Sequence, residues 1–204
     1  MRHEWKFPFH ILFHPFDGFW DLKYENRGRM RVAMVILLLL VVATSLMKQF
    51  SGFLVNYYDP RYLNTLDDLM FTVLPFFLFC VANWSVTTLM EGEGKFREIV
   101  IATAYALLPM ILINIPLTFI SRFLTNEETA FYWMLNSFGA LWFLWLLFVG
   151  NMTIHQYTVT KAVVTLLLTV AAMGIIVFLG ALALTICMDM YWFVYDIYRE
   201  LIFR

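Results

Sequence analysis

The stretch that decides the fold is AVVTLLLTVAAMGIIVFLGALALTICM, residues 162–188. Its 27 residues include no Asp, Glu, Lys, Arg or His. A helix needs about 20 mostly apolar residues to cross a bilayer core of about 30 Å. This stretch is therefore long enough to span a membrane as a single helix.

Four further runs of the chain also lack charged residues, at 32–47, 69–90, 99–121 and 129–154. The first run has 16 residues, and it reaches a spanning length at about residue 50 if Lys48 snorkels to the interface. The pattern predicts an all-α polytopic membrane protein, a bundle of five transmembrane helices. The expected spans are about 32–50, 69–90, 99–121, 129–154 and 162–188.

The composition excludes several classes of protein. Hydrophobic residues make up 62% of the 204-residue chain and charged residues 14%, against about 25% charged in an average soluble domain. A soluble domain of this size could not bury so much apolar surface. We therefore exclude a soluble enzyme, a disordered chain and a nucleic-acid-binding protein.

Lys and Arg residues predict the orientation in the membrane. Nine of the 14 lie on the side shared by the N-terminus and the second and fourth loops, and five lie on the other side. Cytoplasmic loops are enriched in Lys and Arg. We expect a cell-membrane protein with a cytoplasmic N-terminus and an extracellular C-terminus.

The two ends of the chain are predicted to be amphipathic. In the cytoplasmic segment 1–31, Phe16, Phe19 and Trp20 follow Pro15 at near-helical spacing, and we expect them to share one face. This face either packs under the bundle as an anchor or docks a partner. The tail 189–204 either continues the fifth helix or lies on the outer surface as an aromatic belt.

The sequence offers no set of catalytic, metal-binding or cofactor-binding residues. All five runs lack ionisable Asp, Glu, Lys, Arg and His, whereas ion-coupled pumps bury such groups in their spans. Asn83, Asn114 and Asn136 are expected to join helices by hydrogen bonds, or to line a path if the protein transports a solute. Pro109 and Pro116 predict a kinked third span, which is a packing device or one wall of a cleft.

The most specific motif is MEGEGKFRE, residues 90–98, followed by ATAYALLP, residues 102–109. A glycine-containing charged turn before a Tyr-x-x-x-Pro helix resembles the Yip (Ypt-interacting protein) family of five-span membrane proteins. HPFDGFWDLKY, residues 14–24, is similar to the bacterial branch. The resemblance marks Glu91, Gly92, Glu93, Gly94, Arg97, Tyr105 and Pro109 as candidate structural or partner-contact residues.

The resemblance also implies a class of function. Eukaryotic members are linked to vesicle traffic and small GTPases through a long cytosolic region, whereas only 31 residues precede the first run here, so that role is not carried over. Some bacterial members are encoded beside carbohydrate ABC importers. We expect a non-enzymatic accessory or scaffold subunit in the lipid bilayer, with sugar ABC importer permeases as candidate partners. The alternative is a small transporter or channel acting alone or as a homo-oligomer.

Overall fold

The computed structural model describes residues 6–56, 58 and 64–202, and all its regular elements in these ranges are helices. Five of the helical segments are long and apolar enough to cross a membrane, which confirms the predicted fold class. They are α3 (Met30–Phe50), α4 (Thr65–Leu89), the pair α5 (Phe96–Ala106) and α6 (Leu108–Ile120), α7 (Thr129–His155) with the short turn η2 (Asn126–Glu128) before it, and α8 (Val159–Ile202).

The third span is broken, as the prolines predict. Leu107 separates α5 from α6, and Pro109 lies in the first turn of α6, where a missing N–H costs no helical hydrogen bond. Pro75 and Pro116 lie inside α4 and α6, and both helices continue through them. Of these three prolines, Pro109 alone coincides with a break between helices.

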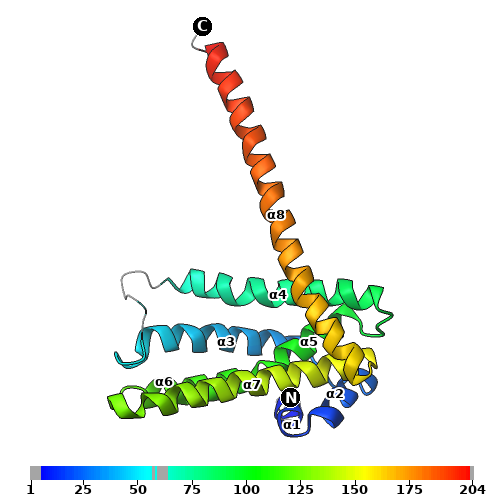
Figure 1. Cartoon of the computed structure of the whole chain (residues 1–204), viewed down its shortest axis with the longest axis vertical. Coiled ribbons are helices and arrows are strands. Elements are labelled where there is room, and N and C mark those ends of the chain that lie inside the picture. Colours follow the sequence, from blue (N-terminus) through cyan, green and yellow to red (C-terminus); the bar gives the residue numbers. More distant parts are fainter. Residues whose placement is uncertain (1–5, 57, 59–63, 203–204) are drawn as a thin grey trace.

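The N-terminal segment forms two short helices, α1 (Phe7–Phe13) and α2 (Pro15–Tyr24). They meet at His14, because Pro15 cannot continue a helix but is well suited to start one. Figure 1 shows both helices at the end of the bundle where α8 begins. The segment therefore packs against the spans.

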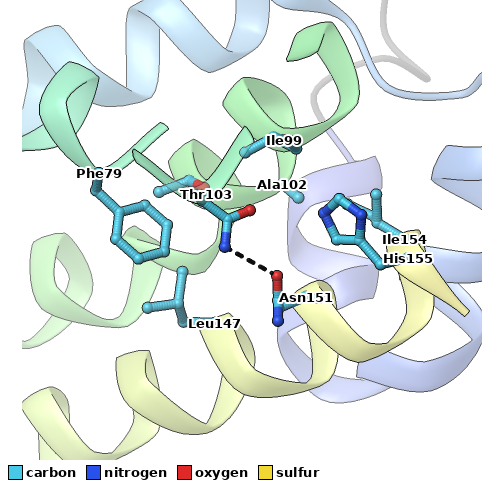
Figure 2. Close-up of a pocket in the computed structure, with 10 residues that line it drawn as sticks. Phe79, Ile99, Ala102, Thr103, Leu147, Asn151, Ile154 and His155 are labelled. Carbon is cyan, nitrogen blue, oxygen red and sulfur yellow. Dashed lines mark hydrogen bonds between the residues drawn. The ribbon is translucent and has the colours of Figure 1, made fainter. Parts of the chain in front are cut away.

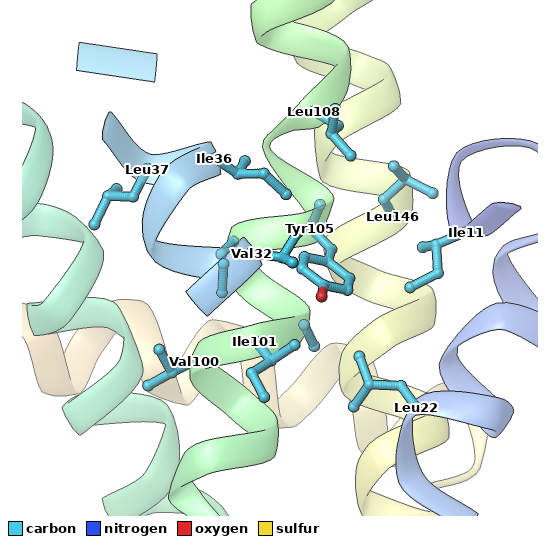
Figure 3. Packing of buried hydrophobic residues seen from close by; sticks show 14 of the residues in the cluster. Ile11, Leu22, Val32, Ile36, Leu37, Val100, Ile101, Tyr105, Leu108 and Leu146 are labelled. Atoms are coloured by element: carbon cyan, nitrogen blue, oxygen red, sulfur yellow. The ribbon is translucent and has the colours of Figure 1, made fainter. Parts of the chain in front are cut away.

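The core is centred on α5, whose residues from Ile99 to Ala106 are all buried. Around it, α3, α4, α6 and α7 run side by side (Figure 1). Figure 3 shows the Tyr105 ring surrounded by apolar side chains from several elements, including α1 and α2. The other labelled members of this cluster are Ile11, Leu22, Val32, Ile36, Leu37, Val100, Ile101, Leu108 and Leu146.

The last helix, α8, differs from the others in length and in burial. Its 44 residues extend about 66 Å at 1.5 Å per residue, and its buried residues are Ala162, Thr165 and Thr169, all in its first three turns. Beyond them it inclines steeply away from the bundle (Figure 1). Residues 189–202 belong to this helix, so the tail continues the fifth span as far as Ile202.

Candidate functional site

The two glycines of the turn between α4 and α5 allow this turn to approach the end of α7. The Gly92 N–H donates to the Thr87 carbonyl at 2.7 Å. A Cβ on Gly92 would lie 2.5 Å from His155 Nδ1, and one on Gly94 would lie 2.6 Å from His155 Cε1. Both distances are too short for carbon contacts, so the motif provides space for His155.

Lys23 joins three elements at this turn. Its Nζ lies 2.8 Å from Glu93 Oε2 and donates to the Ile154 carbonyl at 2.8 Å, with the side chain only 9% exposed. The ammonium of Lys23 lowers the pKa of the Glu93 carboxyl, first through the hydrogen bond and then through its charge. Glu93 itself faces solvent, so screening limits the strength of the pair.

Tyr157, between α7 and α8, completes the contact. Its hydroxyl donates toward the carbonyls of Thr87 and Met90, at 3.3 and 3.2 Å. Burial raises the pKa of the Tyr157 phenol, and the Glu91 carboxylate raises it further, so the hydroxyl keeps its proton as a donor. We name Lys23, Gly92, Glu93, Gly94, His155 and Tyr157 the turn cluster.

Tyr105, Pro109 and Arg97 lie away from the turn cluster. Tyr105 is 1% exposed, and its hydroxyl accepts from the Arg29 N–H at 3.1 Å, which joins α5 to the start of α3. Pro109 starts α6, and Arg97 is exposed on the first turn of α5. The structure thus brings Glu93 and the two glycines of the turn into contact with Lys23 and the end of α7. It places Tyr105 apart from them, in the core.

Phe16, Phe19 and Trp20 lie within about 100° of one another around α2, as their spacing predicts, but they differ in burial. Phe19 is fully buried, and its ring lies so close to Gly150 of α7 that a Cβ there would be 3.0 Å from Phe19 Cζ. Phe16 and Trp20 are half exposed. Contact with α7 buries the edge of this face that carries Phe19 and leaves the Phe16 and Trp20 rings partly open.

A small cavity lies between α4, α5 and α7 (Figure 2), and polar side chains of α4 and α7 meet at it. The Asn83 side-chain amide donates to Asn151 Oδ1 at 3.1 Å and to Thr169 Oγ1 at 3.2 Å, as expected for a residue that joins helices. The adjoining space is about 10 Å³, and Asn151 Nδ2 is buried there without a partner. Asn114 and Asn136 are not among its lining residues.

Neither Asn151 nor Thr169 was predicted as a partner of Asn83. The available signal was weak: an amide and a hydroxyl in two charge-free runs, 68 and 86 residues from Asn83.

At the opposite end of the bundle, Lys48 pairs with Asp68, with 2.5 Å between Nζ and Oδ1. The structure therefore gives Lys48 a buried partner besides its expected place at the interface.

Within the described ranges, no group of three or more His, Cys, Asp or Glu side chains could hold a metal ion. Cys80 is buried and Cys187 is exposed on α8, and both are free thiols. The chemistry of the described polar side chains is that of hydrogen bonds and ion pairs between helices.

The five apolar helical segments define the class of this chain, which is an all-helical, multi-pass integral membrane protein. Residues 9–181 match the model of the Yip1 domain, and the chain belongs to that family. Yip1 family proteins are generally non-enzymatic membrane proteins. No curated protein and no solved structure matches the chain.

Proposed function

We propose that this protein is a non-enzymatic accessory or scaffold subunit of a membrane complex, and that α8 is the surface that binds the partner. The supporting observation is the exposure of this apolar helix. Its buried residues end at Thr169, and it extends 33 residues further, to Ile202. A helix of this kind offers a long surface to the spans of another membrane protein.

One side of α8 is suited to close helix contact. At 100° per residue, Gly180, Ala183 and Cys187 continue the side on which Thr169 is buried. A Cβ added at Gly180 would meet nothing within 4 Å. Small residues let the backbones of membrane helices approach closely, which favours a partner helix at this position.

The finer proposal is a role of the bacterial kind, beside the permease subunits of a carbohydrate ABC importer in the cell membrane. It is supported by the similarity of residues 14–24 to bacterial members. The excess of Lys and Arg on the N-terminal side supports a cytoplasmic N-terminus and an extracellular C-terminus.

Native mass spectrometry of the full chain, purified in a mild detergent, tests this proposal. We expect a stoichiometric membrane-protein partner that is lost in Gly180→Leu. Gly174→Leu is the matched control, because Gly174 is also exposed on α8 but lies about 140° around the helix from Thr169. A chain that runs without a partner would refute the proposal, and so would equal loss of the partner from both variants.

A small transporter or channel is the second candidate, and the buried amides of Asn83 and Asn151 at the small cavity favour it. At about 10 Å³ the cavity is close to the smallest space that holds one water molecule. Transport would require it to open. Proteoliposomes that show no flux of ions or sugars would exclude this candidate.

A further inference from the structure

The outer side of α1 and α2 carries a row of exposed aromatic side chains. Phe13, Phe16 and Trp20 are 68%, 51% and 50% exposed. The rings of Phe13 and Phe16 meet the rings of Trp142 and Trp145 of α7 edge-on, each pair at 6.3 Å between centroids. Because Trp145 is itself half exposed on a candidate span, the aromatic row continues the outer surface of that span.

The position of this row along α7, a candidate membrane span, follows from its tryptophan partners. Trp142 and Trp145 precede the end of α7, at His155, by 13 and 10 residues, or about 20 and 15 Å. Phe13 and Phe16 therefore lie beside α7 and well inside its end, whereas Trp20 lines a hollow with Met152 and Thr153 near that end. The bond from the Arg29 N–H to Tyr105 places the start of α3 about 14 Å inside the start of α5, at Phe96.

A cationic cavity opens close to the start of α3. Its volume is about 640 Å³. Its lining residues are Lys6, Phe7, His10, Glu25, Asn26, Arg27 and Arg29. Ion pairs to Asp21 and Glu25 hold the Arg27 guanidinium in place, and Lys6, Arg27 and Arg29 outnumber these two carboxylates by one.

The first turn of α3 adds to the positive potential beside this cavity. It has no acidic residue and no side-chain cap, and Arg31 follows within it. The partial positive charge of a helix N-terminus favours a phosphate group, and clustered Lys and Arg at the end of a span attract anionic lipid.

From these observations we infer that α1, α2 and the start of α3 bind anionic phospholipid of the leaflet on the N-terminal side. Phe13 and Phe16 lie among the upper acyl chains, Trp20 lies nearer the headgroups, and the cationic cavity receives the phosphate. Tryptophan and tyrosine favour this interfacial depth. A soluble protein partner would instead require the aromatic row to face water.

Native mass spectrometry of the full chain released from nanodiscs tests the headgroup site. We compare discs of phosphatidylcholine with discs that also contain phosphatidylglycerol. We expect wild type to retain phosphatidylglycerol, and the double variant Lys6→Gln, Arg27→Gln to bind it about 25-fold more weakly, at about fivefold per cation. Arg97→Gln is the control, since Arg97 is exposed on the same side but does not line the cavity.

Equal retention by wild type and the double variant would overturn the inference. Thermal unfolding in lipid-free micelles checks that the double variant folds. Inorganic phosphate added to those micelles distinguishes the source of the phosphate group. Stabilisation of wild type by inorganic phosphate to the same degree as by phosphatidylglycerol would indicate a site for free anion and would overturn the inference.

Spin labels in proteoliposomes test the depth of the aromatic row. In a background with both cysteines replaced by alanine, we place one label at Phe13→Cys and a reference label at Phe53→Cys, which is 88% exposed in the turn after α3. We expect relaxation at Phe13 to respond to oxygen more than to a water-soluble nickel chelate. Chelate access at Phe13 equal to that at Phe53 would show a face open to water, and the inference would fail.

Discussion

Replacing Gly92 by alanine tests the contact between the glycine turn and the end of α7. Gly92 does not have a positive φ, so alanine fits its backbone conformation and the change is purely steric. The new methyl group would lie 2.5 Å from His155 Nδ1 and 2.6 Å from Tyr157 Oη. These distances are about 1 Å below the optimum for non-bonded atoms.

The expected loss of stability follows from the neighbours that must move. Overpacking by one methyl group costs about 1–3 kcal/mol. A shift of the Tyr157 hydroxyl also lengthens its bonds to Thr87 and Met90, which are already 3.3 and 3.2 Å long, and each is worth about 1 kcal/mol. We expect the free energy of unfolding to fall by about 3 kcal/mol, which lowers Tm by about 6–12 °C.

Thermal unfolding in detergent micelles measures this loss, with Gly174→Ala as the control. A Cβ on Gly174 meets nothing within 4 Å, and alanine favours a helix over glycine, so Tm of the control should stay the same or rise slightly. Tyr157→Phe should cost less in the Gly92→Ala background than in wild type, because it removes one of the clashing atoms. Equal Tm values for Gly92→Ala and Gly174→Ala would refute the reasoning.

Three further variants test single contacts. Tyr105→Phe removes the hydroxyl that accepts from the Arg29 N–H, so unfolding in micelles should show a loss of about 1–2 kcal/mol; an unchanged Tm would contradict the role of this bond. Gln156 ends α7 with a φ of 56°, which glycine adopts without strain, so Gln156→Gly should raise the free energy of unfolding by about 1 kcal/mol. A lower Tm would count against backbone strain at this residue. Lys23 lowers the pKa of Glu93, so their ion pair stabilises the fold above the ordinary carboxyl pKa of 4.5, and this stabilisation is lost as the pH falls through the lower pKa of the folded state. Glu93→Gln should therefore flatten the pH dependence of Tm. A pH profile of Tm identical to that of wild type would argue against the pair.

Much of the fold follows from charge placement, because a charge-free run of spanning length has few alternatives to a membrane helix. The break in the third span was also predictable, since proline restricts the chain locally at Pro109. The continuation of α8 through the charged tail was not, because Asp189 and Asp196 suit an exposed helix and a surface segment equally. Local sequence does not distinguish these two arrangements.

The turn cluster could be predicted only in part. The glycines of the turn were identified by resemblance, but their physical reason is the proximity of His155 and Tyr157, more than 60 residues away in sequence. Phe19 shows the same limit, since Phe16, Phe19 and Trp20 share one face of α2 and the contact with Gly150 on α7 determines which of the three rings is buried. Pairings between remote helices depend on tertiary packing, which local periodicity does not encode.

The bond from Lys23 to Ile154 has a consequence for biosynthesis. Its acceptor is 131 residues further along the chain, and the Phe19 ring likewise rests on Gly150. At about 5–20 residues per second, a ribosome needs on the order of ten seconds to add this length. The contacts of α2 with α7 therefore cannot form until the fourth span has been made, which leaves the face that carries Phe19 open to chaperones and proteases during that interval.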